Sequence, residues 1–279
     1  MKILITGIYG FLGSHLAERL ASVHDISGLY NTGKRELSVG IPAFHSLEDM
    51  TDVPEAIIMC HAAVASGTTQ LPKTQLQEVN VDLTARIVRK FPEAKVIYIS
   101  SASVYGFPDE VIVEQSAVHP PNDYAASKLD GELVVRQNPN HVVVRLSSLY
   151  GEGMKENTLI PNYVNQALAH RQIEVWGTGN RSQNYIHVSD AVSLIESVLD
   201  TKAVIEFPLL GVSEQEYTNL DVANIIARHI SAGIAHVNQD HSPSVRYDNR
   251  LTQKVLNWKP ETALEKGVAD YIKWKQKQL

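Results

Sequence analysis

The chain has one cysteine, no concentrated basic segment and no metal-binding motif. Cys60 has no partner for an internal disulfide, and its apolar surroundings, AIIMCHAAV, indicate a small buried side chain rather than a reactive thiol. The eleven histidines are scattered, without HExxH or a Cys/His cluster, so no metal site is predicted. The net charge is −6 and lysine and arginine form nothing longer than a pair, so neither nucleic acid nor an anionic membrane is an expected partner.

The sequence also lacks a targeting segment, a long apolar run, internal repeats and low-complexity tracts. Met1 is followed almost at once by the strand-like ILIT, and no apolar run approaches a membrane span, so we expect a cytoplasmic protein. The absence of repeats argues against a structural array or a flexible tail. The 279 residues, 44% of them hydrophobic, suffice for one large domain or two unequal ones.

Short β-rich runs alternate with helical patterns along the first half of the chain. The predicted strands cover residues 2–6, 25–31, 56–64, 95–101 and 141–148. The predicted helices cover residues 11–23, 76–90 and 124–137. Runs such as IIMC and VVVRL are apolar on both faces, as parallel strands covered by helices should be. We therefore predict an α/β fold with a doubly wound parallel sheet of the Rossmann type.

The pattern becomes less regular after Tyr150. Turns are expected at the two glycine pairs of 151–153 and 177–179, and Thr218 and Asp221 form a capping box for a helix over 218–230. We predict a dinucleotide-binding domain and a smaller mixed α/β substrate-binding region. Their boundaries are residues 1–150, with about 184–205 returning to the first domain, and residues 151–183 and 206–279 for the second region.

Three glycines lie directly after the first strand and at the start of the first helix. They are Gly7, Gly10 and Gly13 in ITGIYGFLGSHLAERL. The turn needs residues without a Cβ where a pyrophosphate approaches the backbone, and the free N–H groups of the helix start then meet its charge. A glycine-rich turn without a ligand is the alternative. Strand, spacing and amphipathic helix together predict a dinucleotide site.

The end of the second strand bears on the choice of cofactor. An acidic residue there would bind the adenosine ribose of NAD. This chain has YNTGKR at residues 30–35, and Asp25 lies at the wrong end of the strand. Asn31, Lys34 and Arg35 therefore stand near the ribose, and the two cations suit a 2′-phosphate. We favour NADP, with NAD possible if Lys34 and Arg35 are only a solvated loop pair.

A serine, a tyrosine and a lysine suit carbonyl–alcohol interconversion. Tyr124 and Lys128, in YAASK behind Pro120 and Pro121, lie one helical turn apart on one face. A nearby ammonium is expected to lower the pKa of the phenol from about 10. Ser101, at the carboxyl end of a central strand, can hydrogen-bond the same substrate oxygen. The alternative is a surface tyrosine beside a solvated lysine.

These motifs together resemble the extended short-chain dehydrogenase/reductase family, the NAD-dependent epimerase/dehydratase group of sugar-nucleotide enzymes. The resemblance covers the whole chain, including CHAAV, NVDLT, RLSSLYG and LNWKPETALEKG. It implies a catalytic trio of Ser101, Tyr124 and Lys128, with Lys128 also at the nicotinamide ribose. It implies a homodimer through the helices near 76–90 and 124–137. The cofactor would further be lined by Phe11, Leu12, Ser46, Leu47, His61, Ala62, Ala63, Asn80 and Ser147.

Departures from the family pattern narrow the reaction. The 4,6-dehydratases carry Asp-Glu after the catalytic hydroxyl residue, where this chain has Ala102-Ser103, so dehydration is disfavoured. The GDP-fucose synthase type has a cysteine in place of Ser103 and a histidine near Thr158, and neither is present. A 4-keto-sugar reductase or a 4-epimerase remains. The compact chain and the basic pair after Asn31 favour the reductase; a non-catalytic dinucleotide-binding sensor is the alternative outside enzymes.

The resemblance also points to the substrate side. Besides Ser103, it implies substrate contacts for Asn157, Thr158 and Leu159, which otherwise only lead into a helix near Pro161. In GTGNRSQNYIHVSD (177–190), Gln183 occupies the position of the family's diphosphate-binding arginine. Either Arg181 or Arg246 replaces that arginine, or the substrate lacks a diphosphate.

His187 and Asp190, at the end of the same loop, are interpreted as structural. Asp190 suits the N-cap of a helix starting at Ala191.

Overall fold

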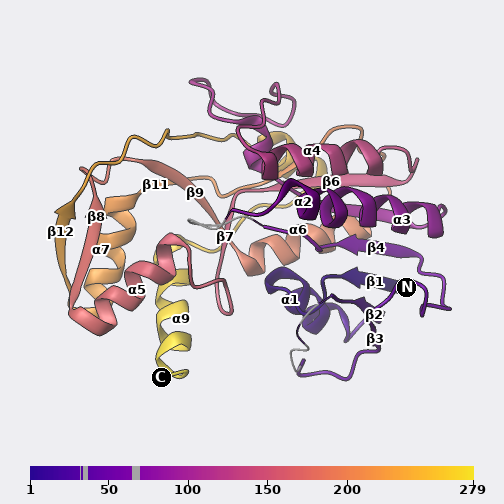
Figure 1. Ribbon diagram of the computed structural model, residues 1–279, viewed down its shortest axis with the longest axis horizontal. Coiled ribbons are helices and arrows are strands. Elements are labelled where there is room, and N and C mark those ends of the chain that lie inside the picture. Colours follow the sequence, from indigo (N-terminus) through magenta and orange to yellow (C-terminus); the bar gives the residue numbers. More distant parts are fainter. Residues whose placement is uncertain (32, 34–36, 65–69) are drawn as a thin grey trace.

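The structure, a computed structural model, describes residues 1–31, 33, 37–64 and 70–279 (Figure 1). Lys34 and Arg35, which the sequence predicts at the cofactor phosphate, lie outside the described residues.

A seven-stranded parallel sheet forms the centre of the molecule, in the order β10-β6-β5-β4-β1-β2-β3. The strands are β1 (Lys2–Thr6), β2 (Asp25–Leu29), β3 (Ala43–Phe44), β4 (Ala56–Met59), β5 (Lys95–Ser101), β6 (His141–Leu146) and β10 (Leu209–Gly211). The predicted doubly wound sheet is confirmed. The strand order reverses between β1 and β4, so a crevice is expected at their carboxyl ends.

Helices cover both faces of this sheet, as Figure 1 shows. The helices of one face are α1 (Phe11–Leu20) and α6 (Val188–Asp200). Those of the other face are α2 (Lys73–Gln77), a π-helical turn (Glu78–Asp82), α3 (Leu83–Lys90) and α4 (Asp123–Val135). On β4, Ile58 packs in the apolar core on the side of α1 and α6, and Ile57 packs in the core on the side of α3 and α4. This explains why the strand is apolar on both sides.

The helix predicted over 76–90 begins earlier, at Lys73, and contains the π-helical turn. A homodimer through α3 and α4 stays a prediction. Within the described ranges, no helix has the length and apolar character needed to cross a bilayer.

The remaining elements lie beside the parallel sheet, on the side of the C-terminus in Figure 1. Their strands are β7 (Ser148–Tyr150), β8 (Gln172–Trp176), β9 (Ser182–His187), β11 (Glu216–Thr218) and β12 (Gly233–Val237). Their helices are α5 (Leu159–His170), α7 (Asn219–Ile230) and α9 (Leu264–Gln276), whereas α8 (Arg250–Leu256) packs against α6 and β10 of the parallel sheet. A separate apolar core lies among them and includes Tyr163, Val175, Ile226 and Tyr271. The predicted domain boundaries stay a prediction.

Of the helix starts predicted at Thr218, near Pro161 and at Ala191, the last two differ in the structure. The capping box of Thr218 and Asp221 is present. Helix α5 starts at Leu159, with Thr158 as its N-cap residue, rather than near Pro161. The prediction that Asp190 caps α6 was wrong, because α6 begins at Val188 and the His187 ring accepts the capping hydrogen bond. The Asp190 carboxylate instead accepts hydrogen bonds from the backbone amides of residues 261 and 262 at 3.1 Å.

Candidate active site

The glycine turn between β1 and α1 is shaped for a close ligand. Gly7 has φ +69°, and a Cβ there would lie 3.0 Å from the backbone of His61. A Cβ on Gly13 would collide with the Gly7 carbonyl oxygen. Gly10 precedes α1 and has no side chain with which to cap it, so the amides of the first turn remain available for an anion. This turn therefore fits the pyrophosphate of a dinucleotide.

A cavity of about 630 Å³ opens beside this turn. Of the predicted cofactor residues, those that line it are Gly7, Gly10, Asn31, Ser46, Leu47, His61, Ala62 and Ala63. Phe11 and Leu12 stand at the start of α1, and the Leu12 side chain is buried in the core below it, so only its backbone can face a ligand. Tyr9 and Tyr30, which the sequence reasoning missed, also line the cavity, with ring centroids 5.0 Å apart.

A carboxylate does lie in this cavity, although not at the end of β2. Glu48 accepts a hydrogen bond from Arg86 at 2.5 Å and another from Ser46. The Ser46 hydrogen bond and the Arg86 guanidinium lower the pKa of Glu48 to about 2, so it is ionised and paired. Glu48 was not among the residues predicted from the sequence, although it directly follows the predicted Ser46 and Leu47.

The inner wall of the cavity depends on two buried polar side chains. His61 lies between the hydroxyls of Thr6, at 2.6 Å, and Thr84, at 3.1 Å, and burial lowers its pKa to about 3. Asn80 exchanges two hydrogen bonds with the backbone of Ala63, at 2.8 and 3.1 Å, and donates one to Ser127 at 2.9 Å. Asn80 is therefore occupied with protein groups and supports Ala63, which lines the cavity in its place.

The fold brings the three predicted catalytic side chains together. Ser101 is the last residue of β5, and its hydroxyl lies 2.8 Å from the hydroxyl of Ser103. The Asn122 side chain caps α4 by accepting a hydrogen bond from the amide of residue 125 at 2.9 Å. That start places Tyr124 and Lys128 on one face of the helix, and Tyr124 makes a hydrogen bond with Ser101.

Burial sets the protonation states of this trio. It raises the pKa of Tyr124, and the hydrogen bond with Ser101 only partly offsets this. The prediction that Lys128 lowers the pKa of Tyr124 below its usual value was therefore wrong. Burial also lowers the pKa of Lys128 to about 7, and its Nζ finds no hydrogen-bond partner within the described part of the chain. Tyr124 is thus protonated at neutral pH and suited to donate a proton.

Two adjoining cavities lie on the substrate side. One of about 280 Å³ is lined by Ser101, Ser103 and the predicted cofactor residue Ser147. A larger one, of about 870 Å³, shares lining residues with it, and its predicted members are Asn157, Thr158, Leu159, Arg181 and Gln183. The predicted substrate segment and the 177–190 loop therefore line adjoining cavities, the smaller of which includes Ser101.

Among the residues that the structure describes, Arg246 lines neither of these two cavities. Its side chain instead donates a hydrogen bond to the Asp109 carbonyl at 3.0 Å. Gln183 donates to the Tyr185 hydroxyl at 3.0 Å and to Asn219 at 2.8 Å, so its amide is already occupied. Arg181 lines both cavities. Of the two arginines considered from the sequence, Arg181 is the one placed to meet a substrate anion.

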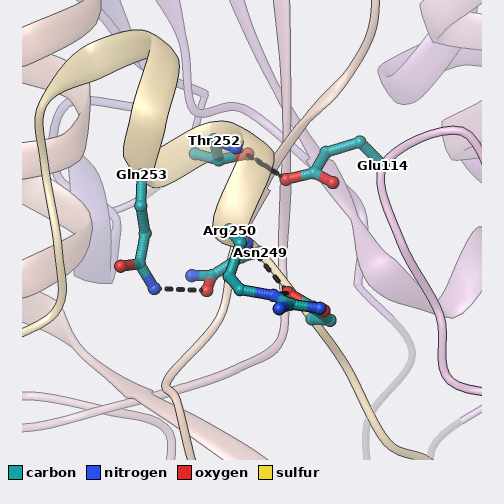
Figure 2. Close-up of polar contacts among 6 residues, drawn as sticks. Glu114, Asn249, Arg250, Thr252 and Gln253 are labelled. Carbon is teal, nitrogen blue, oxygen red and sulfur yellow. Dashed lines mark hydrogen bonds and ion pairs between the residues drawn. The ribbon is translucent and has the colours of Figure 1, made fainter.

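Two segments that are far apart in the sequence meet at one wall of the smaller cavity. Val245 and Tyr247 line it, and the backbone of their segment is held to the loop after Ser101 and Ser103 by two hydrogen bonds of 2.9 Å with the backbone of Ile112. Glu114, buried in that loop, accepts hydrogen bonds from the amide and hydroxyl of Thr252 at 2.8 and 2.7 Å (Figure 2). No local pattern in the sequence indicated this connection.

The chain matches the model of the NAD dependent epimerase/dehydratase family over residues 3–207. The chain belongs to this family. The family resemblance that the sequence predicted is therefore confirmed.

Individual relatives span several reactions. The chain is 24% identical to a dTDP-4-dehydro-6-deoxy-D-allose reductase of a Streptomyces species, over 98% of this chain and 95% of the relative. It is 26% identical to a UDP-N-acetyl-alpha-D-glucosaminuronate decarboxylase of Bacillus cytotoxicus, over 98% and 97%. The UDP-glucuronic acid 4-epimerase of Bacillus cereus, solved with UDP-glucuronic acid and NAD, superposes with a TM-score of 0.88 at 19% identity over the whole of both chains. The family is shared while the reaction varies.

Proposed function

We propose that this protein is an NADP-dependent reductase that converts the 4-keto group of a nucleotide-activated sugar into an alcohol. The observation that carries the proposal is the small cavity at Ser101. None of the described residues that line it bears a carboxylate, and Ala102 and Ser103 follow the serine. Eliminating water requires an acid and a base beside the sugar, whereas reducing a ketone requires one proton donor. Tyr124 supplies that donor.

The roles of the chain's own groups follow from their positions. Ser101 and Tyr124 hydrogen-bond the carbonyl oxygen, and Tyr124 donates its proton to that oxygen as it gains negative charge. Lys128 would hold the nicotinamide ribose and stabilise the phenolate that remains. The amides at the start of α1 would bind the pyrophosphate of the dinucleotide, which when bound would supply the hydride for the carbonyl carbon.

The runner-up is an NAD-dependent 4-epimerase, which would use the same trio in both directions. It is favoured by the NAD bound in the structurally similar Bacillus cereus epimerase. The end of β2 favours the reductase, because Tyr30 and Asn31 offer no carboxylate to a ribose diol. Releasing and identifying the cofactor of the purified protein separates the two. We expect exchangeable NADPH, and tightly retained NAD would favour the epimerase instead.

Replacing Arg35 with alanine is expected to raise the KM for NADPH by about tenfold, which corresponds to roughly 1.4 kcal/mol for a lost charge-assisted contact with the 2′-phosphate. The KM for NADH should stay near its original value. Steady-state kinetics with both cofactors provide the measurement, and Arg228→Ala, which removes an exposed arginine on α7, is the matched control. Equal effects on the two cofactors would remove Arg35 from 2′-phosphate binding.

Replacing Arg181 with alanine is expected to raise the KM for the sugar nucleotide about tenfold to a hundredfold, with a smaller change in kcat, because a guanidinium–phosphate contact is lost. Arg246→Ala is the control, since that side chain is bound to a carbonyl outside the cavity. If Arg181→Ala leaves the KM of every accepted sugar nucleotide unchanged, the 177–190 loop only frames the cavity.

A further inference from the structure

Glu132 is a fully buried carboxylate on the catalytic helix, one turn beyond Lys128. Arg145 on β6 donates to both of its oxygens, from Nε at 2.9 Å and from Nη2 at 2.6 Å. Ser100 on β5 donates a third hydrogen bond at 2.6 Å. The guanidinium also stacks over the Tyr105 ring, 4.6 Å from its centroid. The carboxylate is therefore held in one position by groups from two strands of the sheet.

The other titratable groups around the Lys128 ammonium are neutral. Cys60 follows β4, and burial raises the pKa of its thiol to about 12. Tyr98 on β5 has its ring centroid 4.1 Å from Nζ, and burial raises the pKa of its phenol. His61 is neutral because burial lowers its pKa to about 3. Burial lowers the pKa of Lys128, and the charge of Glu132 opposes this effect by raising the same pKa.

We propose that Glu132 is a positioning residue of the active site, whose carboxylate, fixed by Arg145 and Ser100 one helical turn beyond Lys128, keeps the side chain of Lys128 charged. Ser100 directly precedes Ser101, so the same carboxylate also ties the catalytic helix to the strand that carries the catalytic serine. Glu132 touches neither substrate nor cofactor and acts through Lys128. The inference rests on the proposed function insofar as Lys128 serves the cofactor.

The test separates the charge of Glu132 from its shape. Glu132→Gln keeps the shape and removes the charge, whereas Glu132→Asp keeps the charge. Activity that needs charged Lys128 is present below the pKa of that group and is lost as pH rises through it. Losing the carboxylate lowers this pKa further, so Glu132→Gln should move the alkaline limb of the kcat profile to lower pH by about 1 unit or more. Glu132→Asp should leave the limb close to its original pH, as should Asp130→Asn, an exposed carboxylate on the same helix.

The same shift is expected in the pH dependence of the dissociation constant for NADPH, which requires no substrate. A shift in binding without any 4-keto reduction would leave this inference standing and defeat the proposed function. If Glu132→Gln does not fold, the double variant Glu132→Gln/Arg145→Gln removes both buried charges and should still move the limb to lower pH, by less than the single variant would, because the lost cation partly offsets the lost carboxylate. If Glu132→Gln lowers kcat equally at every pH and shifts neither the kcat profile nor the pH dependence of NADPH binding, Glu132 does not act through Lys128.

Discussion

Replacing Tyr124 with phenylalanine is expected to lower kcat about 10²–10⁴-fold, the range for losing a general acid, while the dissociation constant for NADPH changes less than about twofold. Burial raises the pKa of Tyr124, so the wild-type phenol is protonated at neutral pH and can donate. Phenylalanine removes the donor without changing the ring that packs at the start of α4. Single-turnover oxidation of NADPH gives the chemical rate, and fluorescence titration gives the affinity.

Tyr271→Phe is the matched control for this substitution. That phenol is buried in the core of α5, α7 and α9, and its hydroxyl finds no hydrogen-bond partner among the residues described. Removing it should leave kcat unchanged. Turnover by Tyr124→Phe at the wild-type rate would exclude Tyr124 as the proton donor, whereas a parallel loss of NADPH affinity would indicate a structural defect.

Replacing Arg145 with methionine is expected to lower the free energy of unfolding by about 3–5 kcal/mol, because it leaves the carboxylate of Glu132 buried without its counter-ion. Both side chains of this ion pair are at most 4% exposed. The midpoint of urea denaturation, at an unchanged slope, provides the measurement. The double variant Glu132→Leu/Arg145→Met should recover most of the loss, since no buried charge then remains.

Arg228→Met is the control for the burial argument. Its ion pair with Glu265 is 59% exposed on both sides, and such pairs contribute at most about 1 kcal/mol. A loss at Arg145 no larger than the loss at Arg228 would mean that the buried pair does not stabilise the fold.

Local patterns in the sequence were sufficient to predict β1, the glycine turn and α1. Strand β1, the glycine turn and α1 follow one another in the chain, so apolar periodicity and glycine spacing determine them directly. The spacing of Tyr124 and Lys128 likewise placed both on one face of α4. The direction of the pKa shift of Tyr124 could not be read from spacing, because it depends on burial by segments that are distant in sequence.

Contacts between distant segments account for most of what the sequence left open or misplaced. Asp190 was misassigned as a cap because its partners are the backbone amides of residues 261 and 262. Glu114 finds Thr252 at a sequence separation of 138 residues. The sequence also left Arg181 and Arg246 as equal candidates. Only the fold separates them, since Arg246 points to Asp109 while Arg181 lines both cavities.

The central claim is that this protein reduces a 4-keto sugar nucleotide with consumption of its cofactor. The most direct measurement incubates the purified protein with NADPH and a 4-keto sugar nucleotide such as a dTDP-4-keto-6-deoxyhexose, and follows cofactor oxidation together with the identity of the sugar product. We predict one NADPH oxidised for each 4-keto group converted into an alcohol, with no oxidation by the Tyr124→Phe variant. Interconversion of 4-epimeric sugar nucleotides on retained NAD, without net oxidation of NADPH, would contradict the account.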